Sequence, residues 1–222
     1  MKITVFTCFP EYFCGTFCSL LKRAINKNIL HINIIDIKQY GVGNYTKVDD
    51  KPAGGGSGLI MRADVIEKAF IANFNPEDYI DNCKKQILLP SPRGEKFCQR
   101  TASELSKLND IVILCNRYEG VDQRAIEYFH MRQICIGEYI LMGGETAAMA
   151  IIESSCRLID GVLGNPESIK NETFSGVYNN NIEYDQYTLP RVWNDLHTPD
   201  VLLSGNHEKV AEWRGENKLK KQ

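Results

Sequence analysis

The chain has 222 residues, 43% of them hydrophobic, which is enough for one large or two small globular domains with an apolar core. Its 26 basic and 28 acidic residues give a net charge of −2, which excludes a strongly basic nucleic-acid binder and leaves RNA contact to local patches. No apolar run approaches the roughly 18 residues that cross a bilayer, and the chain starts in a strand pattern rather than a signal peptide, so we expect a cytoplasmic protein without membrane contact.

The first elements predict a β-α-β opening. Residues 2–8 alternate as a strand, residues 11–26 carry apolar side chains on one helical face, and residues 30–37 form a second strand. This order predicts a parallel strand pair joined by a crossover helix. No Gly-x-Gly-x-x-Gly motif follows the first strand, which counts against a Rossmann dinucleotide site and the common Rossmann-like methyltransferase.

A long polar loop follows over residues 39–60. Loops of this length are usually functional or disordered. The run GGGSG at 54–58 suggests a phosphate cradle, but Leu59 and Ile60 stand where a P-loop needs lysine and serine or threonine. The loop is therefore either a flexible lid or part of a site, and Asp50 is either a substrate contact or a solvated charge.

The following stretch continues the α/β alternation. Helices are expected over 63–72, 97–108 and 121–129 and after Glu145, a turn over 75–78, and strands over 86–89, 110–115 and 133–136. The continuous hydrophobic run 110–115 is typical of a strand buried on both faces of a parallel sheet. The pattern predicts an α/β fold with about five or six strands covered by helices.

The three loops that follow these strands in the sequence predict one ligand pocket. They are Leu89–Gly94, Asn116–Gly120 and Ile136–Ala147. Glycine lets backbone groups approach a ligand closely, and ligands of open α/β sheets sit at the carboxyl ends of the strands. We expect the three loops to form the walls of a single site.

The character of the chain changes at Asp160. Residues 160–190 lack periodicity and are rich in Asn, Gly and Pro, which predicts a flexible linker. A small, mostly helical unit should follow, with a helix over 208–220 capped by Ser204 or Asn206. Its apolar stripe is too small to stand alone, so the unit should dock on something larger. The expected divisions are 1–160, 161–190 and 191–222.

Eight cysteines are scattered without Cys-x-x-Cys spacing. Most of them fall in apolar runs, at Cys8, Cys98, Cys115, Cys135 and Cys156. Buried reduced thiols are therefore expected rather than disulfides or a zinc site.

Several motifs follow one another in a specific order: Asp49-Asp-Lys-Pro with Gly54–Gly56, Leu89-Pro-Ser-Pro92, Arg117-Tyr-Glu-Gly120, IGEYILMGGE at 136–145, Gly161-Val-Leu-Gly164 and Val201-Leu-Leu-Ser-Gly-Asn-His207. Each is weak alone, but together they cover nearly the whole chain. With them the chain resembles the bacterial tRNA (guanine-37-N1)-methyltransferase family, TrmD, of the SPOUT class.

The resemblance implies a fold that periodicity cannot predict. The C-terminal part of the α/β domain would be threaded into a deep trefoil knot, although knots are rare in general. The knot loops would hold S-adenosylmethionine, and a homodimer would bind tRNA with guanosine at position 37 across its subunit interface. The methyl group would go to N1 of that guanosine, next to the anticodon, in support of reading-frame maintenance. The family's magnesium dependence adds Mg²⁺ as an expected cofactor, although no metal-ligand cluster appears.

Matching the motifs residue by residue carries the family's cofactor site onto the three loops. The expected cofactor-binding residues are Pro92, Asn116, Tyr118, Glu119, Gly120, Ile136, Gly137, Tyr139, Leu141, Gly143, Gly144 and Ala147. Glu119 is the natural partner for ribose hydroxyls, or else a surface charge in a tight turn. Two departures bear on affinity: Ala147 stands where proline is common, and Asn116 where glycine is common.

The chemistry needs a base and an electrostatic stabiliser. N1 of guanine carries a proton that must leave, and negative charge then develops on O6. The family's base, usually aspartate, maps to Glu172, and its arginine maps to Arg157. Composition alone favours a solvated linker carboxylate for Glu172, and Arg157 equally suits a helix C-terminus.

Expected tRNA contacts lie in both halves of the chain, at Asp50, Gly54, Gly55, Gly56, Ser204, Asn206 and His207. His207 is equally an ordinary first-turn residue, and the basic end with Lys218, Lys220 and Lys221 either touches RNA or only solubilises the terminus. The alternatives are another SPOUT enzyme acting on a ribose 2′-hydroxyl or on rRNA, a non-catalytic RNA-binding relative, and a simple nucleotide-binding α/β protein.

Overall fold

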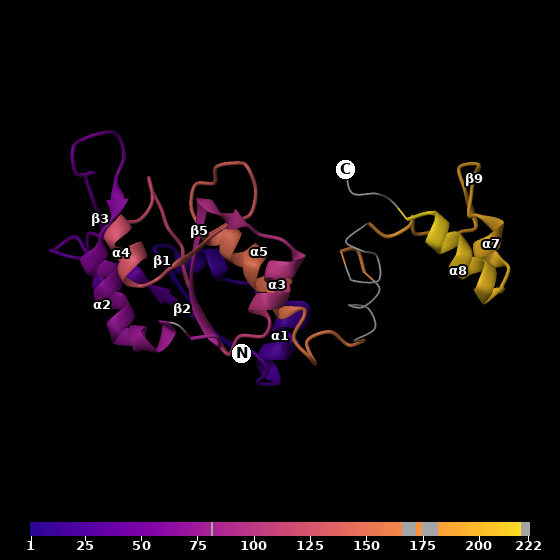
Figure 1. Ribbon diagram of the computed structural model, residues 1–222, viewed down its shortest axis with the longest axis horizontal. Helices are drawn as coiled ribbons and strands as arrows, with labels where there is room; N and C mark the ends of the chain where they lie inside the picture. The colour runs from indigo at the N-terminus through magenta and orange to yellow at the C-terminus, as the bar shows by residue number, and fades with distance from the viewer. Residues whose placement is uncertain (81, 166–171, 175–181, 219–222) are drawn as a thin grey trace. The chain divides into compact units, whose positions relative to one another are not determined.

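The chain divides into two units, Met1–Leu163 and Gly164–Gln222. The computed structural model describes residues 1–80, 82–165, 172–174 and 182–218 (Figure 1). Much of the predicted linker, residues 166–171 and 175–181, lies outside the described residues, and so do Lys220 and Lys221.

The first unit is built on a five-stranded sheet in the order β2-β1-β6-β5-β7. The strands are β1 (Lys2–Thr7), β2 (His31–Asp36), β5 (Lys85–Lys96), β6 (Asp110–Leu114) and β7 (Arg132–Cys135). Every neighbouring pair is parallel. The predicted parallel sheet and its β-α-β opening are confirmed.

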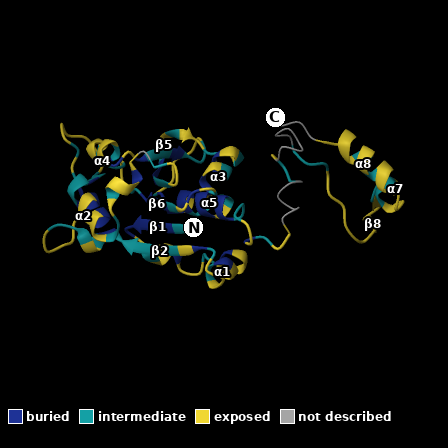
Figure 2. Ribbon diagram, turned by 60° about the horizontal axis from the view of Figure 1, so that its bottom comes forward, coloured by how far each residue is buried: buried dark blue, intermediate teal, exposed yellow. Residues whose placement is uncertain are grey.

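Helices cover both faces of this sheet (Figures 1 and 2). One apolar cluster joins the strands to α1 (Ser19–Asn26), α3 (Gln99–Leu105) and α5 (Glu145–Cys156). The other joins them to α2 (Ala63–Asn73) and α4 (Gln123–Tyr128). Successive strand residues alternate between the clusters, as Val5 and Phe6 do, because side chains of a strand point to opposite faces. The central strands are therefore buried on both sides, as the hydrophobic run in β6 indicated.

The prediction of one long helix over residues 11–26 is wrong. The chain forms a short 3-10 helix, η1 (Pro10–Phe13), and α1 begins only at Ser19. Gly15 lies between them at φ +77°, a left-handed conformation that glycine adopts without strain and that ends a right-handed helix. Apolar spacing continued across the break, so periodicity alone did not reveal it.

Strand β5 is longer than the four residues predicted for it. It extends through the prolines to Lys96, and its register against β7 shifts between Pro90 and Glu95. Residues 91–94 bulge out of the ladder between these two pairings. A Cβ on Gly94 would collide with the backbone of Gln133 and Ile134, so glycine allows the chain to return against β7.

The glycine-rich loop of residues 39–60 contains more structure than its composition indicated. It holds the 3-10 helix η2 (Ile37–Tyr40) at its start and an antiparallel ribbon of β3 (Asp49–Asp50) and β4 (Ile60–Met61). Met61 also pairs with Val121, beside the loop that follows β6. The expected turn over 75–78 is the 3-10 helix η3 (Pro76–Tyr79).

The described residues of the second unit form two short helices and a hairpin. The helices are α7 (Asp200–Leu203) and α8 (His207–Glu216), and the unforeseen hairpin joins β8 (Val192–Trp193) to β9 (Leu196–His197). Both hairpin turn residues, Asn194 and Asp195, have positive φ, as a tight type I′ turn requires. No described residue of this unit is buried, although Trp213 contacts the rings of two tyrosines, Tyr184 and Tyr187.

The expectation of buried thiols holds for only part of the cysteine set. Cys8, Cys115 and Cys156 are buried, Cys135 is half-buried, and Cys14, Cys18, Cys83 and Cys98 are exposed. Cys98 lies in an apolar run, but it precedes α3 at the surface. All eight are free thiols.

Thiol labelling should separate these two groups. Burial raises the pKa of Cys8 to about 11 and that of Cys156 to about 12, so neither forms the reactive thiolate near pH 8. We expect an excess of aromatic disulfide reagent at pH 8 to label the four exposed cysteines quickly and the three buried ones only after unfolding. Peptide mapping by mass spectrometry identifies the sites, and rapid labelling of Cys8 in the folded protein would contradict this burial.

Candidate functional site

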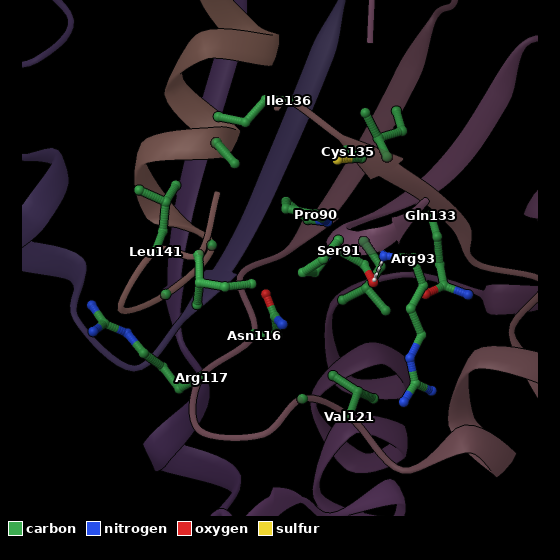
Figure 3. A pocket seen from close by; sticks show the side chains of 18 of the residues that line it. Pro90, Ser91, Arg93, Asn116, Arg117, Val121, Gln133, Cys135, Ile136 and Leu141 are labelled. Carbon is green, nitrogen blue, oxygen red and sulfur yellow. Dashed lines mark hydrogen bonds between the residues drawn. The ribbon is translucent and has the colours of Figure 1, made fainter. Parts of the chain in front are cut away.

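A cavity of about 320 Å³ opens beside the bulge of β5 and the carboxyl ends of β6 and β7. Its walls are the bulge of β5, the loop after β6 and the loop between β7 and α5 (Figure 3). All of the residues expected to bind the cofactor line it: Pro92, Asn116, Tyr118, Glu119, Gly120, Ile136, Gly137, Tyr139, Leu141, Gly143, Gly144 and Ala147. The three loops singled out in the sequence thus meet around one space.

Two glycines of this cavity, Gly143 and Gly144, are closely packed. A Cβ on Gly143 would collide with the side chain of Arg117, and one on Gly144 would lie 3.0 Å from Asn116 Oδ1. The Gly144 N–H donates to the Asn116 carbonyl across 2.9 Å. The loop before α5 is therefore fastened directly to the loop after β6, leaving backbone surface toward the cavity.

The composition of the lining suits a flat organic molecule with polar edges. Pro92, Ile136, Leu141 and Ala147 offer apolar contacts beside backbone amide and carbonyl groups. The cavity volume lies at the lower end of the roughly 300–1,000 Å³ typical of small-molecule sites. Tyr118 lines the cavity and is 52% exposed. Its pKa is raised, first by the partial burial of its side chain and second by the negative charge of Asp49.

The glycine-rich loop lies against one wall of the cavity. Leu59 accepts a backbone hydrogen bond from Glu119 N–H at 3.0 Å, and Met61 N–H donates to Gly120 at 2.9 Å. A Cβ on Gly58 would collide with the Glu119 side chain. Glu119 itself is exposed at the edge of the cavity lining. The sequence did not predict this contact between the two loops.

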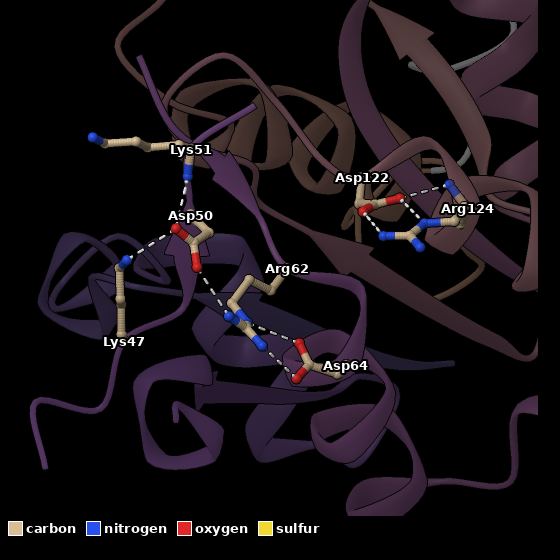
Figure 4. A network of polar contacts seen from close by, with 7 residues as sticks. All are labelled: Lys47, Asp50, Lys51, Arg62, Asp64, Asp122 and Arg124. Atoms are coloured by element: carbon tan, nitrogen blue, oxygen red, sulfur yellow. Dashed lines mark hydrogen bonds and ion pairs between the residues drawn. The ribbon is translucent and has the colours of Figure 1, made fainter. Parts of the chain in front are cut away.

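Asp50 sits in a network of surface charges (Figure 4). Its carboxylate accepts from Lys47 Nζ at 3.2 Å, from the Lys51 N–H at 2.9 Å and from Arg62 Nη1 at 3.1 Å. Arg62 also binds Asp64 through two hydrogen bonds of 3.0 and 2.9 Å. The hydrogen bonds from Lys51 and Lys47 lower the pKa of Asp50, which stays an acceptor at neutral pH.

The other expected tRNA contacts are exposed. Gly54, Gly55 and Gly56 all have positive φ, and a Cβ at any of them would meet nothing within 4 Å. The backbone conformation of this loop tip therefore favours glycine, and crowding does not. In the second unit, Asn206 is the N-cap of α8, accepting from Glu208 N–H and Lys209 N–H, and His207 is the first helical residue. Ser204 caps the end of α7 instead.

The two expected catalytic residues lie in different units. Arg157 follows the last residue of α5, whereas the cavity adjoins the first. Since α5 has 12 residues, its ends lie about 18 Å apart at the usual rise of ~1.5 Å per residue. Glu172 is half-buried in the second unit. The structure of one chain therefore does not bring Arg157 to the cavity that Gly144 lines.

The list of expected cofactor-binding residues omitted several lining residues, among them Ser91, Arg93, Arg117, Gln133, Ile140 and Met142. Arg117, Ile140 and Met142 stand inside the motifs, so their positions were available as a signal. Ser91 and Arg93 lie in the predicted wall Leu89–Gly94, whereas Gln133 lies outside the three predicted loops and enters the wall because the bulge of β5 rejoins β7 beside it.

Known proteins resemble this chain over its full length. The family described as tRNA (Guanine-1)-methyltransferase TrmD matches residues 1–222. A tRNA (guanine-N(1)-)-methyltransferase of Ehrlichia canis (strain Jake) is 43% identical over 215 residues, which is 96% of this chain and 88% of that protein. One of Dictyoglomus turgidum (strain DSM 6724 / Z-1310) is 42% identical over 223 residues, 100% of this chain and 86% of the relative.

Proposed function

The chain belongs to the TrmD family of tRNA (guanine-1)-methyltransferases, and we infer from this membership that it is an enzyme that methylates N1 of a guanine in tRNA. We propose guanosine 37, next to the anticodon, as the target and S-adenosylmethionine as the methyl donor. The observation that carries the proposal is the single cavity lined by every residue expected to bind the cofactor. A simple nucleotide-binding protein would not require this whole set of motifs.

The cavity suits S-adenosylmethionine. The apolar side chains of Ile136, Leu141 and Pro92 would hold the adenine faces, and the backbone of Gly137 to Gly144 would bind its polar edge. When bound, the donor supplies a methyl group already activated by the positive charge on sulfur. The protein then has to orient the guanine, remove its N1 proton and exclude water.

In this proposal Glu172 accepts the proton of guanine N1, and Arg157 faces O6. The base frees the N1 lone pair, and the guanidinium stabilises the negative charge that develops on the ring. Both side chains already have interactions within the protein, so tRNA would have to compete for them. Asp50, the Gly54–Gly56 tip and the start of α8 would position the anticodon loop.

We propose a homodimer with its active site between the subunits. The support is the place of Arg157, which follows α5 at the end away from the cavity of its own subunit. A second copy would let Arg157 and Glu172 of one subunit serve the cavity of the other. The second unit has no buried described residue, which fits a small tRNA-binding domain that docks on a larger body.

Three further features follow from the family. A trefoil knot is proposed because the segments that the family threads through one another line one cavity here. Among the described residues, no group of three or more His, Cys, Asp or Glu side chains is placed to hold a metal, and Mg²⁺ stays a prediction. No described helix is long and apolar enough to cross a membrane, and a cytoplasmic location is our proposal.

The function is tested by mapping methylated nucleosides. The protein is incubated with S-adenosylmethionine and a tRNA transcript that carries guanosine at position 37, and a matched transcript carries adenosine there. We expect one methyl group, recovered as N1-methylguanosine at position 37 by nuclease digestion and mass spectrometry, and none with adenosine.

Other outcomes would point to the alternatives. Methylation of a ribose 2′-hydroxyl, or of rRNA in place of tRNA, would indicate a different SPOUT activity. Cofactor binding without methyl transfer to any tRNA would indicate an RNA-binding relative that has lost turnover, with the Glu172 replacement as its cause.

A further inference from the structure

A buried carboxylate lies where two walls of the cavity meet. Glu145 is the first residue of α5 and is only 1% exposed, and the chemistry proposed above gives it no part. Acidic side chains are almost never fully buried unless they are paired. Its place just after the Gly143–Gly144 turn connects it to the cavity wall, so its partners matter.

The carboxylate binds two separate segments. Oε1 accepts from Thr7 Oγ1 at 2.8 Å and from Arg117 Nε at 3.2 Å, and Oε2 lies 3.0 Å from Arg117 Nη2. Thr7 ends β1, and its hydroxyl oxygen also accepts from the Phe9 N–H at 2.9 Å. Glu145 thus ties the start of α5 both to the central strand and to the loop after β6.

Arg117 completes the connection from the other wall. Its Nη1 donates to the Met142 carbonyl at 3.2 Å, and its guanidinium lies 4.3 Å from the centroid of the Phe9 ring. In Figure 3 its side chain extends away from the side chains of Pro90 and Ser91, so it faces the outside of the wall rather than the centre of the cavity. Two nitrogens of the planar guanidinium face the Glu145 carboxylate and the third donates to the Met142 carbonyl, so the group acts as a fork.

This arrangement fixes charge as well as position. A donor with a positive sulfur would be repelled by an uncompensated guanidinium at the cavity wall, and the buried carboxylate neutralises Arg117 in place. The contact between Arg117 and Glu145 also leaves no room for a side chain at position 143. A Cβ on Gly143 would collide with Arg117 and would lie 2.5 Å from Glu145 Oε2.

We propose that Glu145 and Arg117 are positioning residues for the cofactor. The clamp, meaning Glu145 with Arg117 and Thr7, holds the loop after β6 and the loop before α5 at the separation that the cofactor needs. This inference rests on the proposed function. It predicts an effect on cofactor affinity, with little effect on the methyl-transfer step once the cofactor is bound.

The test is a set of variants of the full chain measured by calorimetric titration with S-adenosylmethionine. Glu145→Gln should raise Kd about tenfold or more, because it leaves Arg117 without its counter-charge. Arg117→Lys keeps the charge but loses the fork and should also raise Kd. The double variant should be no weaker than Glu145→Gln alone, because both changes break one connection.

A control separates positioning from general stability. Asp110→Asn makes the same carboxylate-to-amide change in an ion pair with Lys2 at the opposite ends of β1 and β6, 3.6 Å from Lys2 Nζ. It should lower the melting temperature without changing Kd. For the clamp variants, kcat at saturating cofactor should stay near that of the original protein while KM rises.

Two results are decisive in different ways. Circular dichroism first shows which variants are folded at the titration temperature. If folded Glu145→Gln binds the cofactor within twofold of the original protein, or Arg117→Lys does so where the first variant does not fold, the clamp proposal is overturned. If the original protein itself fails to bind S-adenosylmethionine, the proposed function fails instead.

Discussion

Glu172→Gln and Arg157→Ala are each expected to lower methyl transfer about 100-fold or more while cofactor binding is kept. Glutamine cannot accept the N1 proton, and alanine leaves the charge on O6 without a guanidinium. Both side chains are proposed to act on the guanine and not on the cofactor, so the Kd for S-adenosylmethionine should stay within about twofold. Single-turnover rates at saturating cofactor and tRNA, with calorimetry for Kd, measure both quantities.

Two further changes make the first of these tests specific to Glu172. Glu172→Asp restores the residue usual in the family and should keep most of the rate. Glu183→Gln removes another half-buried carboxylate of the same unit and should leave the rate unchanged. A full rate in both Glu172→Gln and Arg157→Ala would refute the two assignments together.

The parts of the fold that sequence predicts are those with a local cause. The parallel sheet follows from hydrophobic runs such as 110–115 and from the β-α-β order, and both features depend on side chains close together in the chain. The break at Gly15 and the bulge of β5 depend on distant partners, since Gly94 is required by Gln133 and Ile134. Periodicity contains no information about such contacts.

The site divides in the same way. Motifs predicted the three walls, because each wall follows one strand and carries its own glycines. They did not predict that Glu119 packs against Gly58, or that Arg117 reaches Glu145, since these pairs lie far apart in the sequence. What joins Arg157 and Glu172 to the cavity is an assembly of subunits in our proposal, and a single sequence specifies that only through family resemblance.

These contacts suggest how the two substrates affect one another. The glycine-rich loop, which we assign to tRNA, bonds through Leu59 and Met61 to the wall that carries Glu119 and Gly120. A change in that wall on cofactor binding would therefore reach the tRNA side directly.

Gly143→Ala is expected to raise the Kd for S-adenosylmethionine by roughly 5- to 150-fold, the effect of overpacking by about 1–3 kcal/mol. The added methyl group would collide with Arg117 and with the Glu145 carboxylate, both held by the clamp. To relieve the collision, either Arg117 and Glu145 must leave their positions in the clamp or the loop before α5, a cavity wall, must move. Calorimetric titration of the folded variant measures the change.

Gly215→Ala is the matched control for this change. Gly215 lies within α8 of the second unit, and a Cβ there would meet nothing within 4 Å. In a helix, alanine is more stable than glycine by about 1 kcal/mol. This variant should therefore be slightly more stable and bind the cofactor with unchanged affinity. Equal affinity in Gly143→Ala and Gly215→Ala would mean that the wall at Gly143 yields without cost, and that the rigid cavity inferred from the clamp does not exist.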